Sequence, residues 1–249
     1  MSSTTTRTTP PPETIDRPGG DRFVSNAMLA VAAVLLAIQV MAGHVIPPVT
    51  VFGVLFLGIG IAVGRRRTRW LLAIAIVLSL LYLGGSLPFF VTNLAHPESP
   101  VGFILEAFVA LATLTTLVGA VLGLRDPRTA ATRRPIAFAA GGLAVLAVVI
   151  ALAASSGVTT EPRQADDVAI EAVRSTFPAL VSVPAGDAVL WVDNQDPFHH
   201  TLVIEGTDHR IDLPASTSVR LPVSLEPGTY RYLCDVPGHE SMAGDLDVR

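Results

Sequence analysis

One nine-residue stretch near the end of the chain brings a cysteine, a histidine and a methionine close together. Cys234 is followed by His239 five positions later and by Met242 three positions after that. A Phe-His-His-Thr stretch containing His199 and His200 lies upstream, with His200 placed 34 residues before Cys234. A thiolate, imidazoles and a thioether together suit a soft ion such as copper, which cycles between Cu(I) and Cu(II). The pattern therefore predicts a copper site.

Cys234 is the single cysteine of the 249-residue chain, so no disulfide can form within it. An exposed lone thiol is prone to oxidation, and a metal-ligand role removes that hazard. The alternative is a buried, inert cysteine. In the stretch before it, Tyr230, Tyr232 and Cys234 share one face of an expected strand, because side chains alternate with a period of two. The turn at 235–238 then lets one loop present three side chains to a metal.

The fourth side chain must come from another strand, and 201–204 begins directly after His200. Residues 168–249 contain several short β-rich runs separated by Gly, Pro, Asn and Asp turns, among them 188–192, 201–204, 218–223 and 230–234. Short strands at this spacing favour a small all-β sandwich.

Two motifs in this region resemble those of cupredoxins, the small blue-copper electron carriers. They are Asn-Gln-Asp-Pro-Phe-His-His-Thr at 194–201 and Gly-Thr-Tyr-Arg-Tyr-Leu-Cys-Asp-Val-Pro-Gly-His-Glu-Ser-Met at 228–242. The stretch 183–194 is also similar to the early strands of that family, and the resemblance covers about residues 165–249. It implies a Greek-key β-sandwich that carries one electron at a time.

The resemblance also implies a ligand set for one mononuclear type 1 copper. His200, Cys234 and His239 would be the equatorial ligands, and Met242 the weak axial ligand. His200 is chosen over His199 because the histidine followed by threonine matches the family position. In the family the second loop histidine lies near the surface and admits the electron, which assigns that role to His239.

Other copper proteins fit the residues less well. A binuclear copper centre of the oxidase-subunit type needs two cysteines, and the chain has one. Copper nitrite reductases and multicopper oxidases place a histidine directly before the cysteine, where this chain has Leu233. A mononuclear carrier, rather than an enzyme, is therefore expected.

The rest of the chain is typical of a membrane protein. Half of the residues are hydrophobic and 15% are charged, against about 25% in a typical soluble domain. The sequence predicts a Ser/Thr/Pro-rich disordered cytoplasmic tail at 1–22, a transmembrane domain at 23–154, a flexible polar linker at 155–167 and the copper domain at 168–249. Five apolar segments of roughly membrane-spanning length are expected at 24–46, 49–64, 70–91, 101–124 and 136–154.

Arginine placement predicts the orientation of these segments. Arginines precede the first segment and fill two of the connections, whereas the alternate connections, 43–48 and 92–100, contain none. The arginines concerned are Arg7, Arg17, Arg22, Arg65, Arg66, Arg67, Arg69, Arg125, Arg128, Arg133 and Arg134. Cytoplasmic connections are enriched in arginine and lysine. We therefore expect a multi-pass protein of the cell membrane, in contact with the lipid bilayer, with its N-terminus cytoplasmic and its copper domain extracytoplasmic.

Charge indicates the kind of partner. Residues 155–249 hold 6 Arg and 15 Asp or Glu, a net charge of −9. Such a domain disfavours nucleic acid. It favours a redox partner protein or membrane complex with a basic docking face, mainly by steering the encounter.

Two alternative functions stay open at this level. The copper domain could bind and deliver copper without redox turnover, or it could be an accessory to a quinol-oxidising or transport module formed by the helices. His44, His96, Met41 and Glu106 fall in or near the outward connections. An intramembrane carboxylate is a functional candidate by default, so these groups could form an outer site for a quinol, a haem or copper transfer. The alternative is an interfacial histidine pair and a glutamate that faces polar groups of the bundle.

Overall fold

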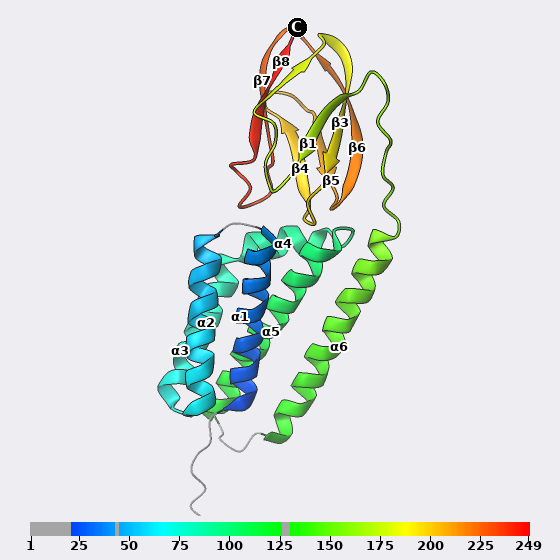
Figure 1. Ribbon diagram of the computed structural model, residues 1–249. Helices are drawn as coiled ribbons and strands as arrows, with labels where there is room; N and C mark the ends of the chain where they lie inside the picture. Colours follow the sequence, from blue (N-terminus) through cyan, green and yellow to red (C-terminus); the bar gives the residue numbers. More distant parts are fainter. Residues whose placement is uncertain (1–20, 43–44, 126–129) are drawn as a thin grey trace, which may run out of the picture.

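The protein has two parts joined end to end (Figure 1). The computed structural model describes residues 21–42, 45–125 and 130–249. A bundle of helices forms the N-terminal part, and a β-sandwich sits on one end of that bundle. The predicted order, apolar helices followed by an all-β domain, is confirmed. The expected tail, most of it at 1–20, and His44 lie outside the described residues.

The described part of the chain holds six helices, of which four are long and apolar enough to cross a membrane. A bent pair, α3 and α4, raises the number of candidate spans to five if the pair counts as one. Helix α6 packs mainly along α5 and leaves most of its surface open. The helices are α1 (Arg22–Ala42), α2 (Pro47–Arg65), α3 (Arg69–Gly85), α4 (Leu87–Ala95), α5 (Pro100–Arg125) and α6 (Ala130–Ser155).

The third apolar segment differs from the single helix expected over 70–91. It breaks at Ser86, and the axes of α3 and α4 differ by 58°. Pro88 explains the break, because proline lacks an N–H and its ring would collide with the carbonyl four residues earlier. Proline is tolerated in the first turn of a helix, and Pro88 occupies that place in α4. The short α4 therefore bends across the end of the bundle that faces the sandwich.

A buried carboxylate joins three helices at the opposite end of the bundle. Asp21, directly before α1, is 2% exposed and accepts hydrogen bonds of 2.8 and 2.7 Å from both terminal nitrogens of Arg133 in α6. Its backbone N–H donates to the carbonyl of Val63 in α2. The Nε of Arg67 lies 3.8 Å from the same carboxylate. Arginines from two of the predicted cytoplasmic connections thus meet at one end, away from the sandwich.

Two sheets form the sandwich, and their inner faces enclose one hydrophobic core. One sheet has the strand order β1-β3-β6 and the other the order β2-β8-β7-β4-β5. Strands β1 and β3 pair in parallel, as do β2 and β8, and the other pairs are antiparallel. Cys234 and Met242 belong to the core cluster. The strands are β1 (Val168–Ala172), β2 (Leu180–Val183), β3 (Gly186–Asn194), β4 (His200–Ile204), β5 (Arg210–Leu213), β6 (Thr217–Leu225), β7 (Gly228–Leu233) and β8 (Ala243–Val248).

The segment between α6 and β1 is fastened to the sandwich rather than free along its length. The backbone N–H of Glu161 donates to the carbonyl of Ser218, and the indole N–H of Trp191 donates to the carbonyl of Glu161. Arg220 donates two hydrogen bonds of 2.8 Å to the carboxylate of Asp167. A flexible coil was expected over 155–167, and these contacts instead fix its second half against β3 and β6.

Gly244 in β8 provides a test of this packing. A Cβ at this position would overlap the carbonyl oxygen of Pro178 and lie 2.9 Å from two ring atoms of Tyr232. Overpacking a core costs about 1–3 kcal/mol, and backbone cannot move aside as a side chain can. We expect Gly244→Ala to lower the free energy of unfolding of the sandwich by about 3 kcal/mol, measured by urea denaturation. Gly228→Ala is the control, because its Cβ would meet only Tyr230 at 3.7 Å; equal losses in both variants would contradict the packing.

Candidate metal centre

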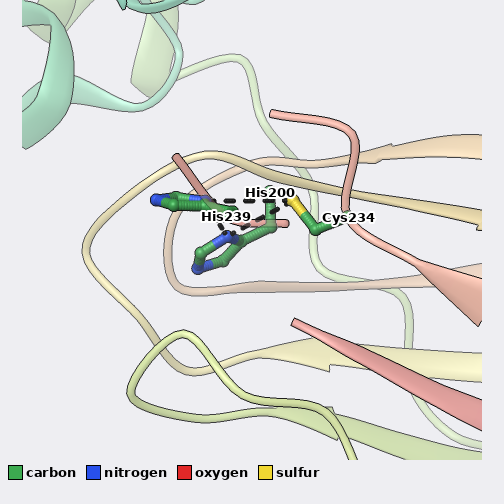
Figure 2. A group of neighbouring side chains, drawn as sticks. All are labelled: His200, Cys234 and His239. Atoms are coloured by element: carbon green, nitrogen blue, oxygen red, sulfur yellow. Dashed lines mark hydrogen bonds between the residues drawn. The ribbon is translucent and has the colours of Figure 1, made fainter. Parts of the chain in front are cut away.

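Three predicted ligands come together at the end of the sandwich that faces the helices. His200 is the first residue of β4, Cys234 follows β7 directly, and His239 lies in the loop before β8. One ligand atom from each lies within 4.8 Å of the other two. Figure 2 shows the two imidazoles and the sulfur pointing toward one another. His200 and Cys234 are buried, whereas His239 is partly exposed.

The spacing of these donor atoms fits a bound copper ion. The Nδ1 atoms of His200 and His239 are 3.0 Å apart, and the Cys234 sulfur lies 3.9 and 3.8 Å from them. A point in the plane of the three atoms is about 2 Å from each, close to a metal–imidazole bond length. Two imidazole nitrogens that face each other at 3.0 Å also need a proton or a metal ion between them. The donor set, two imidazoles and one thiolate, is that of a type 1 copper site.

A buried carboxylate orients His200. The Oδ2 of Asp196 lies 3.0 Å from the Nε2 of His200. Burial raises the pKa of Asp196, but hydrogen bonds from His200 and from two backbone N–H groups outweigh it and hold this pKa below its usual value. An ionised carboxylate only accepts, so Nε2 carries the ring proton and Nδ1 keeps its lone pair for a metal.

A tight turn holds Asp196 in place. The backbone N–H groups of Arg174 and Ser175 donate to Oδ1 and Oδ2 of Asp196 at 2.6 and 2.7 Å. Both residues have positive φ, 51° and 54°, and successive N–H groups in such a turn form a concave anion site. Asn194 completes the support, because its Oδ1 accepts from the N–H of Asp196 at 3.0 Å.

Cys234 is held as a thiolate. Its sulfur accepts a hydrogen bond of 3.5 Å from the backbone N–H of Thr201. Burial raises the pKa of Cys234, but the nearby imidazoles of His200 and His239 and the hydrogen bond from Thr201 outweigh it and lower the pKa to about 5. The thiolate is the form that binds metals. Thr201 also links the two halves of the site, because its hydroxyl donates to the Oδ1 of Asp235 at 2.7 Å and accepts from the backbone N–H of Asp235 at 2.9 Å.

Backbone hydrogen bonds close the ligand loop. The N–H of Cys234 donates to the carbonyl of Met242 at 2.9 Å, and the N–H of Met242 donates to the carbonyl of His239 at 2.8 Å. Gly238 has a φ of +83°, a conformation that favours glycine at this turn. The side chain of Met242 is 0% exposed and packs in the core. Its role as axial ligand stays a prediction.

The second histidine of the pair, His199, does not join this group. It is buried, and its ring stacks on His96 of the α4–α5 connection, with centroids 3.7 Å apart and planes at 13°. Burial, with the nearby His96, lowers the pKa of His199 to about 4, so its ring is neutral at physiological pH. Of the two histidines, His200 is the one beside Cys234, as the threonine after it predicted.

The end of the sandwich that carries His200, Cys234 and His239 contacts the helical part. The N–H of Ala215 donates to the hydroxyl of Ser99 at 3.0 Å. A Cβ at Gly238 would lie 2.8 Å from Cε1 of Phe89 in α4. The ligand loop therefore touches the helical part directly, next to the partly exposed His239.

Sequence reasoning missed the role of Asp196, which it assigned only to a turn. The available signal was a carboxylate four residues before His200, next to a proline that prevents a helix. The hypothesis of an outer site for a quinol, a haem or copper transfer stays a prediction. His96 contacts the copper domain through His199, whereas Glu106 is buried within α5 and belongs to neither of the His/Cys/Asp/Glu groups found among the described residues.

Comparison with known proteins identifies the domain. Residues 142–248 match the model of the cupredoxin-like domain family. A comparison with curated proteins gave no match. Among solved structures, auracyanin B is 23% identical, over 37% of this chain and 95% of its own, with a TM-score of 0.31. Amicyanin from Paracoccus versutus (Thiobacillus versutus) is 18% identical, over 35% of this chain and 85% of its own, with a TM-score of 0.30.

The family match covers all eight strands, the three clustered side chains and the second half of α6. It ends where the sandwich ends, and the first five helices lie outside it. The C-terminal part of this chain is thus a cupredoxin-like domain, joined to a helical region with four or five candidate membrane spans.

Proposed function

We propose that the protein is a membrane-anchored type 1 copper protein that carries single electrons at the outer face of a cell membrane. The observation that supports this most strongly is the placement of His200, Cys234 and His239, whose donor atoms surround one point at ligand distance. Met242 is proposed as the weak axial ligand. Copper bound there would supply a Cu(I)/Cu(II) couple.

The residues around the site suit electron transfer because they hold the ligands still. Asp196 fixes the orientation of His200, and the Thr201 N–H stabilises the sulfur of Cys234. Both groups are buried in the sandwich. A site that does not rearrange between two oxidation states loses little energy to reorganisation. His239, the partly exposed ligand, is the proposed point of electron entry.

The proposed orientation places the copper domain outside the cell and the N-terminus in the cytoplasm. It is supported by the arginine-rich end of the bundle, where Arg67 and Arg133 surround Asp21 far from the sandwich. Protease added outside intact cells should therefore digest the copper domain. Digestion only after the cells are opened would contradict the orientation.

The proposed partner is a redox protein or membrane complex with a basic face, because the segment 155–249 carries a net charge of −9. Attraction between charged surfaces acts mainly on the encounter rate and weakens as salt screens it. The partner is not a nucleic acid, which the same charge repels. No enzymatic activity is proposed for the copper domain.

Voltammetry of the full chain in detergent tests the function against copper delivery. Loaded with one equivalent of copper, the protein should show a reversible one-electron couple and keep its copper through many cycles. As a control, a Cu(I) chelator of moderate affinity is added to the same loaded chain. The copper should stay bound to the protein. A protein that releases Cu(I) to that chelator in each reduced phase is a copper-delivery protein, and the electron-transfer proposal then fails.

A further inference from the structure

A second group of potential ligands lies between the two parts of the molecule. His96 comes from the α4–α5 connection, His199 precedes β4 and Asp212 lies in β5. One donor atom from each lies within 4.8 Å of the others. We propose that these three residues bind a divalent transition-metal ion, Cu(II) or Zn(II), which fastens the copper domain to the helical region.

Within the part of the chain that the structure describes, the buried ring of His199 lacks hydrogen-bond partners. Its side chain is 2% exposed, and its Nδ1 has no hydrogen-bond partner. Its Nε2 lies 3.7 Å from the Oδ1 of Asp212, which is too far for a hydrogen bond. Buried polar groups are nearly always paired, and an exception calls for an explanation such as an ion. Among the described residues neither ring nitrogen of His199 has a hydrogen-bond partner, and an ion between its Nε2 and the Oδ1 of Asp212 supplies one for Nε2.

His96 has a carboxylate partner of the kind that metal-binding histidines commonly have. Its Nδ1 lies 2.7 Å from the Oε1 of Glu98. A carboxylate that accepts from one ring nitrogen fixes the tautomer, so the other nitrogen, Nε2, keeps its lone pair. Metal-binding histidines commonly have such an outer carboxylate. His96 and Glu98 are both about one-quarter exposed, with side-chain exposures of 25% and 26%, which gives an ion a path to the site.

The donor types set the class of ion. Two imidazoles and one carboxylate suit Zn(II) and Cu(II), and they lack the soft sulfur that favours Cu(I). Asp212 is also 3.0 Å from Arg210, so the ion must compete with a guanidinium for this carboxylate. That pair is about half exposed, and exposed ion pairs are worth only about 0–1 kcal/mol. Arg210 therefore does not prevent binding.

The two rings must part for both to reach one ion. In the structure they are stacked at 13°, so their lone pairs run side by side instead of converging. His199 is packed in the domain, whereas His96 sits in the short connection between α4 and α5 with a quarter of its side chain exposed. The inference is that the His96 ring turns when the ion binds. Because His96 belongs to the helical part and His199 to the sandwich, the ion then links both parts.

The test uses the full chain with Cys234→Ser and His239→Gln, so that neither the thiolate nor the facing imidazole pair of the type 1 site competes. Equilibrium dialysis in detergent against Zn(II), and separately against Cu(II), should show one bound ion per chain. Adding His96→Gln should weaken binding by more than about 100-fold, because even an outer partner is worth 10–100-fold. Adding Glu98→Gln should weaken it by about 10–100-fold. His209→Gln, a histidine on the β4–β5 turn, is the matched control and should leave binding unchanged.

The result that overturns the site is an equal affinity in the His96→Gln and His209→Gln chains, or no bound ion in either. The two rings would then only stack. Thermal unfolding of each variant in excess chelator should give the same midpoint, so that lost binding is not lost folding. The two dialysis experiments also distinguish the ions. A Cu(II) EPR signal with nitrogen couplings identifies copper, and binding in the Zn(II) experiment alone identifies zinc. The outcome is independent of the electron-transfer proposal, because the chain with Cys234→Ser and His239→Gln has no type 1 site.

Discussion

Replacing Cys234 by serine is expected to abolish the intense visible absorption of the copper-loaded chain completely. That absorption arises from charge transfer between a thiolate sulfur and Cu(II), and the serine hydroxyl is a hard, weakly acidic group that cannot replace it. Apart from Cys234, the loop at 234–242 contains one soft ligand, Met242. Affinity for Cu(I) should fall together with the colour, measured by competition with a chelator.

Met242→Leu is the matched variant for this experiment. Leucine has a similar volume and fits the core position of Met242, which is 0% exposed. The colour should remain, with a shifted reduction potential, because the three other donors are intact. The ligand assignment is wrong if Cys234→Ser keeps the band, or if Met242→Leu removes it as fully as the cysteine substitution does.

Asp196→Asn is expected to have the second-largest effect, because it alters the carboxylate behind His200. The amide is neutral and presents an NH2 group where the carboxylate accepts from His200 or from the N–H groups of the 174–175 turn. Loss of an outer partner should cost about 10–100-fold in Cu(II) affinity. The reduction potential should rise, because a nearby negative charge stabilises Cu(II) more than Cu(I).

Asp187→Asn is the control for charge alone. Asp187 is exposed at the far end of β3, so the same change in net charge occurs away from the site. Voltammetry and the EPR spectrum of both variants give the comparison. A potential that moves equally in both, or that falls in Asp196→Asn, would show that Asp196 does not act through His200.

The clustering of the candidate ligands could be predicted from sequence because their geometry is local. Cys234 and His239 lie in one loop whose ends are joined by the Cys234–Met242 and Met242–His239 backbone hydrogen bonds. A nine-residue loop of this kind leaves few ways to arrange its side chains. His200 required one further step, the pairing of β4 with β7, and the two strands are indeed neighbours. The resemblance of the motifs to cupredoxins supplied that step.

The role of Asp196 could not be predicted, because it depends on residues far away in sequence. Its carboxylate is held by a left-handed turn at Arg174 and Ser175, more than 20 residues earlier. Neither is glycine or asparagine, the residues that usually mark such a turn. Nothing in their local sequence therefore indicates that they form an anion site.

In the helical region too, local features could be predicted from sequence and long-range contacts could not. Apolar length predicted the candidate spans, because bilayer thickness sets the length of a spanning helix, and arginine placement predicted which connections share a side. The break at Ser86 was missed because the apolar run continues through it, although Pro88 carries the signal. The contact between His96 and His199 joins residues over 100 positions apart, and no sequence period reports such a contact.

X-ray absorption at the copper edge of the wild-type chain loaded with one equivalent of copper, in detergent, tests the central claim most directly. The claim is that His200, Cys234 and His239 hold one copper ion between them. We predict a first shell of one short copper–sulfur bond and two imidazole nitrogens, nearly unchanged between the oxidised and the reduced protein. A first shell made only of nitrogen and oxygen, or one that changes its ligands on reduction, would contradict the account.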